Sequence, residues 1–299
     1  MVLPNFLIFG VQKAGTTSIY SYLEQHPQVY TSPRKETNFF GHVFDEPDPD
    51  AKLTRGGRKR ILTIEDYEAL FDGATDEIAI GEASPDYLFH HKQAVPGIQK
   101  YVPDAKLIAV LRNPVERAYS DYLMHIRQVV GNRKPLAEQL ETSAQSSHTL
   151  LKGRYYEGLK HFLDTFGSEQ IKVFLYDDLR KDSAKLMQEM YSFIGVDADY
   201  AVDTGRKQQT AQIPKNQSVN KLLQTKNPLR TAAGALLRRV LPEEKRQALR
   251  SRLIAANSTG KEGLPLSDED RQRLQDYYRD DVRQLQDLIE RDLSIWFDL

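Results

Sequence analysis

A turn near the N-terminus, bracketed by two glycines, carries residue types that could bind an anion. It reads Gly10-Val11-Gln12-Lys13-Ala14-Gly15-Thr16-Thr17-Ser18 and follows the short apolar run Phe6 to Phe9. Where a strand passes through such a turn into a helix, backbone N–H groups and the positive end of the helix dipole point at the turn. Lys13 and three hydroxyl side chains add a charge and further donors. We therefore expect a phosphate or sulfate group to bind here.

The spacing of this turn distinguishes two kinds of anion site. Gly10 and Gly15 match the start of the nucleotide-triphosphate loop G-x-x-x-x-G-K-[ST], but Thr16 stands where that pattern has its lysine. The lysine comes earlier, at Lys13. This departure argues against a nucleotide kinase. The plain alternative is a tight turn that joins a strand to a helix and carries a solvated lysine.

A second group of polar residues follows another apolar run. Lys106 to Leu111 leads into Arg112-Asn113-Pro114, and Ser120 comes on the helix expected next. Ligands of open parallel sheets bind where the strands end, and a guanidinium fork suits a dianionic phosphate. Taken alone, Arg112 could equally form a salt bridge and Ser120 could lie on a helix surface.

Together the two segments resemble the donor-binding motifs of sulfotransferases that use 3′-phosphoadenosine 5′-phosphosulfate (PAPS). The resemblance covers most of the chain and is strongest to the branch that holds bacterial sulfotransferases and the heparan sulfate enzymes. It continues through four further segments: Lys35-Glu36-Thr37-Asn38-Phe39-Phe40, Gly81-Glu82-Ala83-Ser84-Pro85-Asp86-Tyr87, Gly153-Arg154-Tyr155-Tyr156 and Arg291-Asp292-Leu293-Ser294-Ile295-Trp296.

This resemblance implies a role for each group of residues. The 5′-phosphosulfate would be held by Lys13, Ala14, Gly15, Thr16, Thr17 and Ser18, with Lys13 also catalytic. Arg112 and Ser120 would hold the 3′-phosphate. Three basic residues would close over the donor from a lid: Arg206, Lys207 and Lys215. PAPS would be the donor substrate, with its 3′,5′-bisphosphate PAP as product, and no metal is expected.

A base must accept the proton of the acceptor hydroxyl. The resemblance assigns this role to Glu36, which precedes the aromatic pair Phe39-Phe40. His42 and His125 are the alternatives, and Glu36 could instead be a surface carboxylate paired with Arg34 or Lys35.

Two further functions remain open beside sulfuryl transfer to a small-molecule or carbohydrate acceptor. One is a nucleotide-dependent kinase with the same kind of loop. The other is a nucleotide-binding module without turnover. Ala83 stands where the glycosaminoglycan enzymes of this type carry a lysine, which argues against a polyanionic acceptor.

The elements that must position these residues follow from the apolar pattern. Short apolar runs at Phe6–Phe9, Lys106–Leu111 and Ile171–Tyr176 indicate buried strands, with a fourth at Ile78–Gly81, and helical spacing indicates a helix over Tyr155–Phe166. Alternation of strands and helices predicts an α/β fold with a central parallel sheet flanked by helices, like that of P-loop nucleotide kinases.

We expect a single domain over residues 1–299. Residues 1–207 would form the α/β core, 208–263 a helical lid or acceptor-side segment, and 264–299 a long C-terminal helix that returns to the core. Ser267 is the expected N-cap of that helix, and its apolar stripe includes Leu274, Tyr278 and Val282.

Composition limits the setting. The 299 residues have a net charge of −1 and no cysteine, which excludes disulfides, thiolate nucleophiles and cysteine-ligated metals and fits a reducing compartment. The N-terminal residues lack the pattern of a signal peptide. We therefore expect a cytoplasmic protein without nucleic-acid partners or required membrane contact, whose oligomeric state the sequence does not determine.

Overall fold

The computed structural model describes residues 2–42, 60–205, 213–214, 216, 257–259 and 264–297. The described chain divides into two compact units, Met1–Arg117 with Arg154–Gln208 and Tyr278–Leu299, and Ala118–Gly153 with Gln209–Tyr277. The first unit contains a five-stranded sheet and the turn near the N-terminus. The expected boundaries at residues 207 and 263 stay predictions.

The sheet of the first unit is parallel throughout and has the order β2-β3-β1-β4-β5. Its strands are β1 (Phe6–Gly10), β2 (Val29–Thr31), β3 (Ala79–Ala83), β4 (Lys106–Leu111) and β5 (Ile171–Leu175). β1 is the middle strand, and all five of its residues are buried. A strand with neighbours on both edges and helices on both faces needs a continuous apolar run, as the sequence of β1 predicted.

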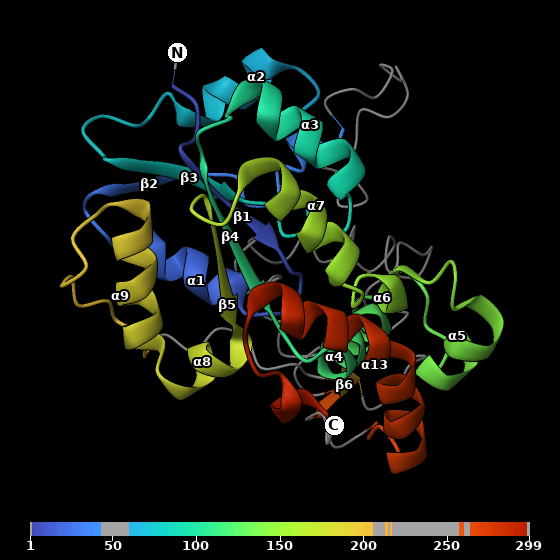
Figure 1. Ribbon diagram of the computed structural model, residues 1–299. Helices are drawn as coiled ribbons and strands as arrows, with labels where there is room; N and C mark the ends of the chain where they lie inside the picture. Colours follow the sequence, from blue (N-terminus) through green and yellow to red (C-terminus); the bar gives the residue numbers. More distant parts are fainter. Residues whose placement is uncertain are drawn as a thin grey trace, which may run out of the picture. The chain divides into compact units, whose positions relative to one another are not determined.

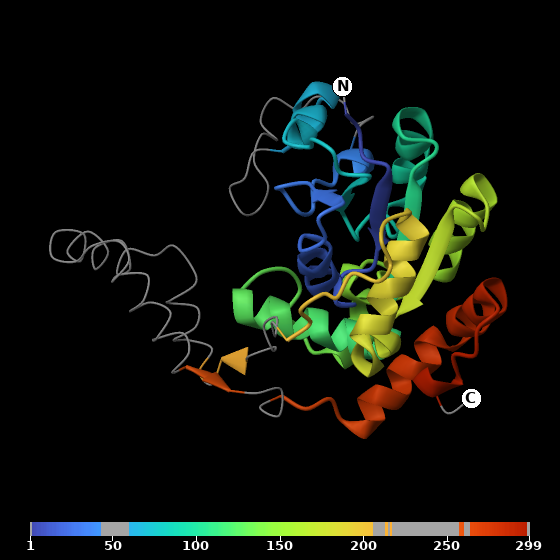
Figure 2. The ribbon, with the colours of Figure 1, turned by 90° about the vertical axis from the view of Figure 1, so that its left-hand side faces the viewer.

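Helices cover both faces of this sheet (Figures 1 and 2). On one face α1 (Thr16–Leu23) lies beside α9 (Ser183–Ile194), where the Tyr191 hydroxyl donates to the Tyr22 carbonyl over 3.2 Å. On the other face α3 (His91–Tyr101) packs on α7 (Tyr156–Phe166), whose Phe162 stacks on Phe9 of β1 at 4.2 Å between ring centroids. The expected α/β class and parallel sheet are confirmed.

The remaining elements are shorter or lie between these. In the first part of the chain they are η1 (Phe39–Gly41), α2 (Ile64–Glu68) and η2 (Ala69–Phe71). In the middle they are α4 (Pro114–Gln128), α5 (Leu136–Ser143), α6 (His148–Leu151) and α8 (Tyr176–Lys181). Towards the C-terminus they are β6 (Ile213–Pro214), β7 (Ser258–Thr259), α13 (Asp268–Ile289) and η4 (Ser294–Trp296). Strands β6 and β7 form an antiparallel pair.

The long C-terminal helix α13 is confirmed, and its N-terminus is capped as expected. The Ser267 hydroxyl accepts the backbone N–H of Asp270 over 3.1 Å. The apolar stripe Leu274, Tyr278 and Val282 is fully buried. No helix among the described residues is both long and apolar enough to cross a membrane. The cytoplasmic location stays a prediction.

Several element boundaries differ from the expectation by one or two residues, and for β5 and α7 the structure shows a local cause. Tyr176 begins α8 rather than ending β5, because the Asp178 carboxylate accepts the N–H of Leu175 over 3.3 Å and starts the helix there. Helix α7 begins at Tyr156, and the N–H of Tyr155 before it is bound by Asp281 over 2.7 Å. Most of the expected lid, residues 208–263, lies outside the described residues.

Candidate active site

The turn after β1 leaves backbone donors at the start of α1. Within the described residues, no hydrogen bond uses the N–H groups of Gly15, Thr16 and Thr17, whereas the next two, Ser18 and Ile19, both bond to the Gly15 carbonyl over 2.9 and 3.1 Å. The first N–H groups of a helix have no partner within the helix and need an outside acceptor. Three adjacent donors on the positive end of a helix form a site suited to an oxyanion.

Gly15 is required by the shape of this turn. Its φ of 82° lies in the left-handed region, and an added Cβ would come within 2.5 Å of Leu179 Cδ2 and 3.1 Å of Tyr176 Cε2. A side chain here would therefore displace the turn from α8. Lys13 has a φ of 74°, which is uncommon for a residue with a side chain. Such strained residues concentrate at binding and catalytic sites.

Arg112 is joined directly to this turn. It follows β4, and its Nη1 donates to the Lys13 carbonyl over 2.8 Å. The guanidinium lies over the Tyr176 ring at 4.7 Å from the centroid and 3.8 Å from the Glu116 carboxylate. The side chain is 11% exposed, and burial lowers the pKa of Arg112 from its usual value without removing its charge. The structure thus brings the Arg112 guanidinium to the backbone of Lys13, and the roles of both residues in donor binding stay predictions.

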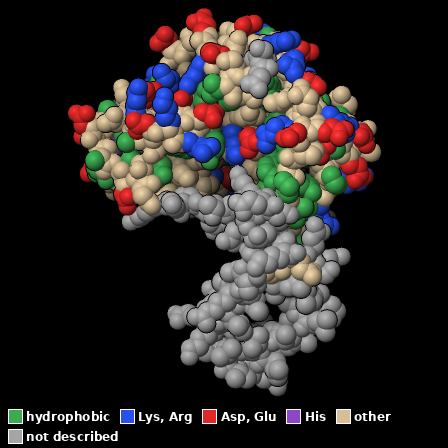
Figure 3. Space-filling view, turned by 90° about the horizontal axis from the view of Figure 1, so that it is seen from below, with side chains coloured by type: hydrophobic (Ala, Val, Ile, Leu, Met, Phe, Trp, Pro, Cys, Tyr) green, Lys and Arg blue, Asp and Glu red, His purple; other side chains and the backbone are tan. Residues whose placement is uncertain are grey.

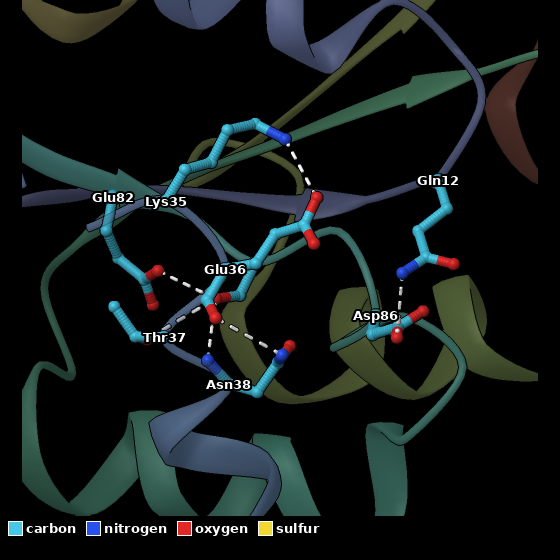
Figure 4. A network of polar contacts seen from close by, with 8 residues as sticks. Gln12, Lys35, Glu36, Thr37, Asn38, Glu82 and Asp86 are labelled. Carbon is cyan, nitrogen blue, oxygen red and sulfur yellow. Dashed lines mark hydrogen bonds and ion pairs between the residues drawn. The ribbon is translucent and has the colours of Figure 1, made fainter. Parts of the chain in front are cut away.

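The sequence analysis missed two residues that support this arrangement. Tyr176 supplies the ring beneath the Arg112 guanidinium, and Asp86 accepts a 2.9 Å hydrogen bond from the Gln12 side chain. Figure 4 shows this link between the turn after β1 and the turn after β3. Nothing in the spacing of either residue indicated these contacts. Both depend on neighbouring strands that end side by side.

Ser120 lies on α4, two turns after Arg112 in the sequence, and is buried. It belongs to the second compact unit, so its role in phosphate binding stays a prediction. The Asn113 side chain accepts the N–H groups of Val115 and Glu116 over 3.0 and 3.3 Å and so starts α4 directly after the arginine. Arg206, Lys207 and Lys215 lie outside the described residues.

Glu36 lies on a turn held against the end of β3, next to the strand that carries Lys13. Its N–H donates to the Ala83 carbonyl over 2.8 Å, and its φ of 61° is again left-handed. The carboxylate is 45% exposed and 2.9 Å from Lys35 Nζ (Figure 4). An ion pair this exposed contributes at most about 1 kcal/mol to stability. Because 45% of the Glu36 side chain is exposed, its carboxylate is accessible. Both residues proposed as catalytic, Lys13 and Glu36, have strained backbones.

The two histidine alternatives have different surroundings. His42 directly follows η1, and its ring centroid lies 6.4 Å from that of His90. His125 belongs to the second unit, where its Nδ1 lies 3.3 Å from the Asn132 carbonyl and 3.4 Å from the Thr149 hydroxyl. The choice of base among Glu36, His42 and His125 stays a prediction.

Charged side chains of both signs are interspersed on the face shown in Figure 3, in keeping with the net charge of −1. The surface as a whole thus gives little attraction for an anion. Binding of an anionic ligand must rest on local groups, which here are the α1 N-terminus, Lys13 and Arg112.

A strand that passes through a glycine turn into a helix at the middle of a parallel sheet defines a protein of the P-loop-like class. Comparison with protein families places residues 3–257 in the sulfotransferase domain family, to which this chain belongs. A crystal structure of a sulfotransferase from Alicyclobacillus acidocaldarius is 29% identical and covers 99% of both chains with a TM-score of 0.71. The confirmed fold and family agree with the resemblance stated from the sequence.

Curated relatives match over shorter lengths. Bifunctional heparan sulfate N-deacetylase/N-sulfotransferase 1 of Caenorhabditis briggsae is 28% identical over 211 residues, 64% of this chain and 22% of that protein. Carbohydrate sulfotransferase 15 of Mus musculus is 35% identical over 160 residues, 40% of this chain and 27% of that protein. The chain thus spans about a quarter of the length of these two relatives.

Proposed function

We propose that this chain transfers the sulfuryl group of PAPS to an acceptor hydroxyl. The observation that carries the proposal is the set of three adjacent N–H groups, at Gly15, Thr16 and Thr17, without a partner in the described structure and flanked by Lys13 and Arg112. These donors fit a phosphosulfate, and the guanidinium fork fits the second phosphate that distinguishes PAPS from ordinary nucleotides. Family membership supports the same donor.

The chemistry required of the protein is positioning and charge stabilisation. As the acceptor oxygen bonds to sulfur, the bond between sulfur and the bridging phosphate oxygen breaks, and negative charge develops on the leaving phosphate. Lys13 and the α1 N–H groups stabilise that charge. Glu36 accepts the acceptor proton on the opposite side. No step assigned to these residues needs a metal ion.

A carbohydrate is the acceptor class that the names of the two relatives support. Ala83 is fully buried beneath the Glu36 turn and contributes no charge there. We therefore expect neutral or weakly charged sugars to be better acceptors than highly sulfated ones.

Donor binding tests the proposal directly. PAP at 100 times its dissociation constant should add about 2.7 kcal/mol to the free energy of unfolding, measured by thermal denaturation. Adenosine 5′-phosphate, which lacks the 3′-phosphate, serves as the matched control and should stabilise less. Stabilisation by ATP with magnesium but not by PAP would favour the kinase.

Transfer itself requires a second assay. Radiolabelled PAPS is incubated with a panel of neutral, amino and sulfated oligosaccharides, and label in the product identifies the acceptor. Strong PAP binding without transfer to any acceptor would favour the binding module.

Replacement of the proposed base gives a prediction at this site. Glu36→Gln keeps the shape of the side chain but cannot accept a proton, so kcat should fall by roughly 100-fold to 10,000-fold. The dissociation constant of PAP, measured by calorimetry, should change little. Wild-type turnover in Glu36→Gln together with loss of turnover in His42→Ala or His125→Ala would move the role of base to a histidine.

A further inference from the structure

A fully buried carboxylate lies beneath the turn that carries Glu36. Glu82, on β3, is 0% exposed and accepts hydrogen bonds from the hydroxyls of Ser84 and Tyr87, both over 2.7 Å, and from that of Tyr67 over 3.4 Å. No Lys or Arg in the described structure forms an ion pair with it. Burial raises the pKa of Glu82, and the hydroxyl bonds oppose that shift. Burial of this carboxylate costs folding free energy, and the proposed sulfuryl transfer assigns it no role.

Two of the hydroxyls that donate to Glu82 also accept hydrogen bonds from backbone N–H groups of the Glu36 turn. Ser84 Oγ accepts the N–H of Asn38 over 3.0 Å, and the Tyr87 hydroxyl oxygen accepts the N–H of Phe40 over 3.3 Å. Thr37 Oγ1 lies 3.3 Å from Ser84 Oγ and accepts the N–H of Phe39 over 3.3 Å. Three consecutive backbone N–H groups, those of Asn38, Phe39 and Phe40, are therefore held by hydroxyls linked to this buried network.

Glu82 determines the direction of these bonds. A carboxylate only accepts, so the single protons of the Ser84 and Tyr87 hydroxyls are used towards it. Their lone pairs are then left for the N–H groups of the turn. A side chain with fewer than two accepting oxygens at this position would leave one of these protons without an acceptor, and that hydroxyl would lose the contact that orients its lone pairs towards the turn.

The turn needs such support because its backbone is strained. Glu36 and Asn38 have φ values of 61° and 52°. Left-handed residues with side chains cost roughly 1 to 3 kcal/mol each and persist only when the surroundings hold them. We propose that Glu82 is a positioning residue, which holds the Glu36 turn through Ser84 and Tyr87 and so fixes the Glu36 carboxylate at the acceptor. This inference rests on the proposed role of Glu36.

Glu82→Gln tests the proposal with little change in shape. The amide has one accepting oxygen, so one of the two hydroxyls loses its acceptor. Misplacement of a reacting group by about 1 Å costs about 100-fold, and we expect kcat to fall by about that factor with the acceptor selected from the oligosaccharide panel. The dissociation constant of PAP should stay at its wild-type value, because no contact of Glu82 involves the turn from Lys13 to Thr17. An equal loss of kcat and PAP affinity would indicate a purely structural role and overturn the proposal.

A double-mutant cycle separates this proposal from the one on which it rests. If Glu82 acts through Glu36, Glu82→Gln should lower kcat in the wild type but not further in Glu36→Gln. Loss of kcat that multiplies in the double variant would overturn the positioning role alone. Wild-type turnover in Glu36→Gln would overturn the role of Glu36 and the positioning role with it.

Two hydroxyl deletions decide the matter even if Glu82→Gln fails to fold. Tyr87→Phe removes the link between Glu82 and the N–H of Phe40, and kcat should fall without a change in PAP affinity. Tyr67→Phe is the matched control, since it removes a donor to the same carboxylate but no acceptor of a turn N–H, and its ring still stacks on Phe39 at 4.5 Å. Equal turnover in both variants would overturn the proposal.

Discussion

At the scale of single residues, Lys13 is the lysine of the turn that precedes the α1 N–H groups. Lys13→Ala should lower kcat by roughly 100-fold to 1000-fold, as loss of one preorganised donor to a developing charge does in other enzymes. The melting temperature should stay near that of the wild type, because the Lys13 side chain is half-exposed. Lys185→Ala, at an exposed lysine of α9, is the control for loss of a positive charge. Turnover within a factor of two of wild type would remove Lys13 from the mechanism.

Arg112 is expected to recognise the 3′-phosphate. A hydrogen bond to a charged group contributes about 1.5 to 3 kcal/mol, so Arg112→Ala should weaken PAP by about 10-fold to 100-fold more than it weakens adenosine 5′-phosphate. Both ligands should also lose some affinity, because Arg112 holds the Lys13 carbonyl. Calorimetry with the two nucleotides makes the comparison, and Arg180→Ala at an exposed arginine is the control. An equal loss for both nucleotides would show that Arg112 does not contact this phosphate.

At the scale of elements, the turn between β1 and α1 depends on Gly15 for two separable reasons. In Gly15→Ala the alanine would have to adopt a left-handed φ, and its Cβ would clash with Leu179. Both the free energy of unfolding and the affinity for PAP should therefore fall. Gly195 has the same φ of 82°, but nothing lies within 4 Å of an added Cβ. Gly195→Ala should therefore lose about 1 kcal/mol of unfolding free energy from strain alone, with unchanged PAP affinity. Unchanged affinity in Gly15→Ala would mean that the turn adapts to the side chain.

The same elements show how far the sequence could predict the fold. β1 and β4 were identified because each is buried along almost its whole length and therefore reads as an apolar run. β5 was identified from its apolar residues Val173, Phe174 and Leu175, although it is an edge strand whose Lys172 is exposed rather than the fully buried strand expected. β2 was missed, since its three residues Val29–Thr31 form an edge strand too short to show a period. β3 continues to Ala83, past the apolar run expected to end at Gly81, because Glu82 is buried there with hydroxyl partners.

The candidate site was predictable to the same degree and for the same reason. Lys13, Arg112 and the α1 N-terminus were found because local spacing after a strand places them. The support of Glu36 by Ser84 and Tyr87 was not, because it depends on register between chain segments about 46 residues apart. Glu82 was quoted only within a motif. Hydroxyl residues two and five positions after an acidic residue in an apolar strand are the signal that could have indicated it.

At the scale of the whole molecule, the part of α13 from Tyr278 onward belongs to the same compact unit as the sheet and contacts the start of α7 through a buried carboxylate. Asp281 accepts the N–H of Tyr155 over 2.7 Å and lies 3.4 Å from that of Tyr156, so it binds the start of α7 from 126 residues away in the sequence. Burial raises the pKa of Asp281 to about 6, although the two N–H groups and Arg154 oppose the shift. At neutral pH Asp281 is thus ionised, although burial of its charge away from water is unfavourable.

The sign of the resulting pH dependence follows from this shift. The folded pKa lies above the unfolded value of about 3.9, so the stability contributed by Asp281 is complete below about pH 4 and is lost as pH rises through about 6. Asp281→Asn cannot titrate. Relative to wild type, the free energy of unfolding of Asp281→Asn should therefore increase by about 2 kcal/mol between pH 4 and pH 7, measured by urea denaturation. Asp287→Asn, at an exposed position of α13, corrects for general effects of charge. The opposite result is a difference in unfolding free energy between Asp281→Asn and wild type that is flat or falls from pH 4 to pH 7. It would show that the folded protein stabilises the ionised carboxylate of Asp281, so that its negative charge would strengthen the contact with the start of α7.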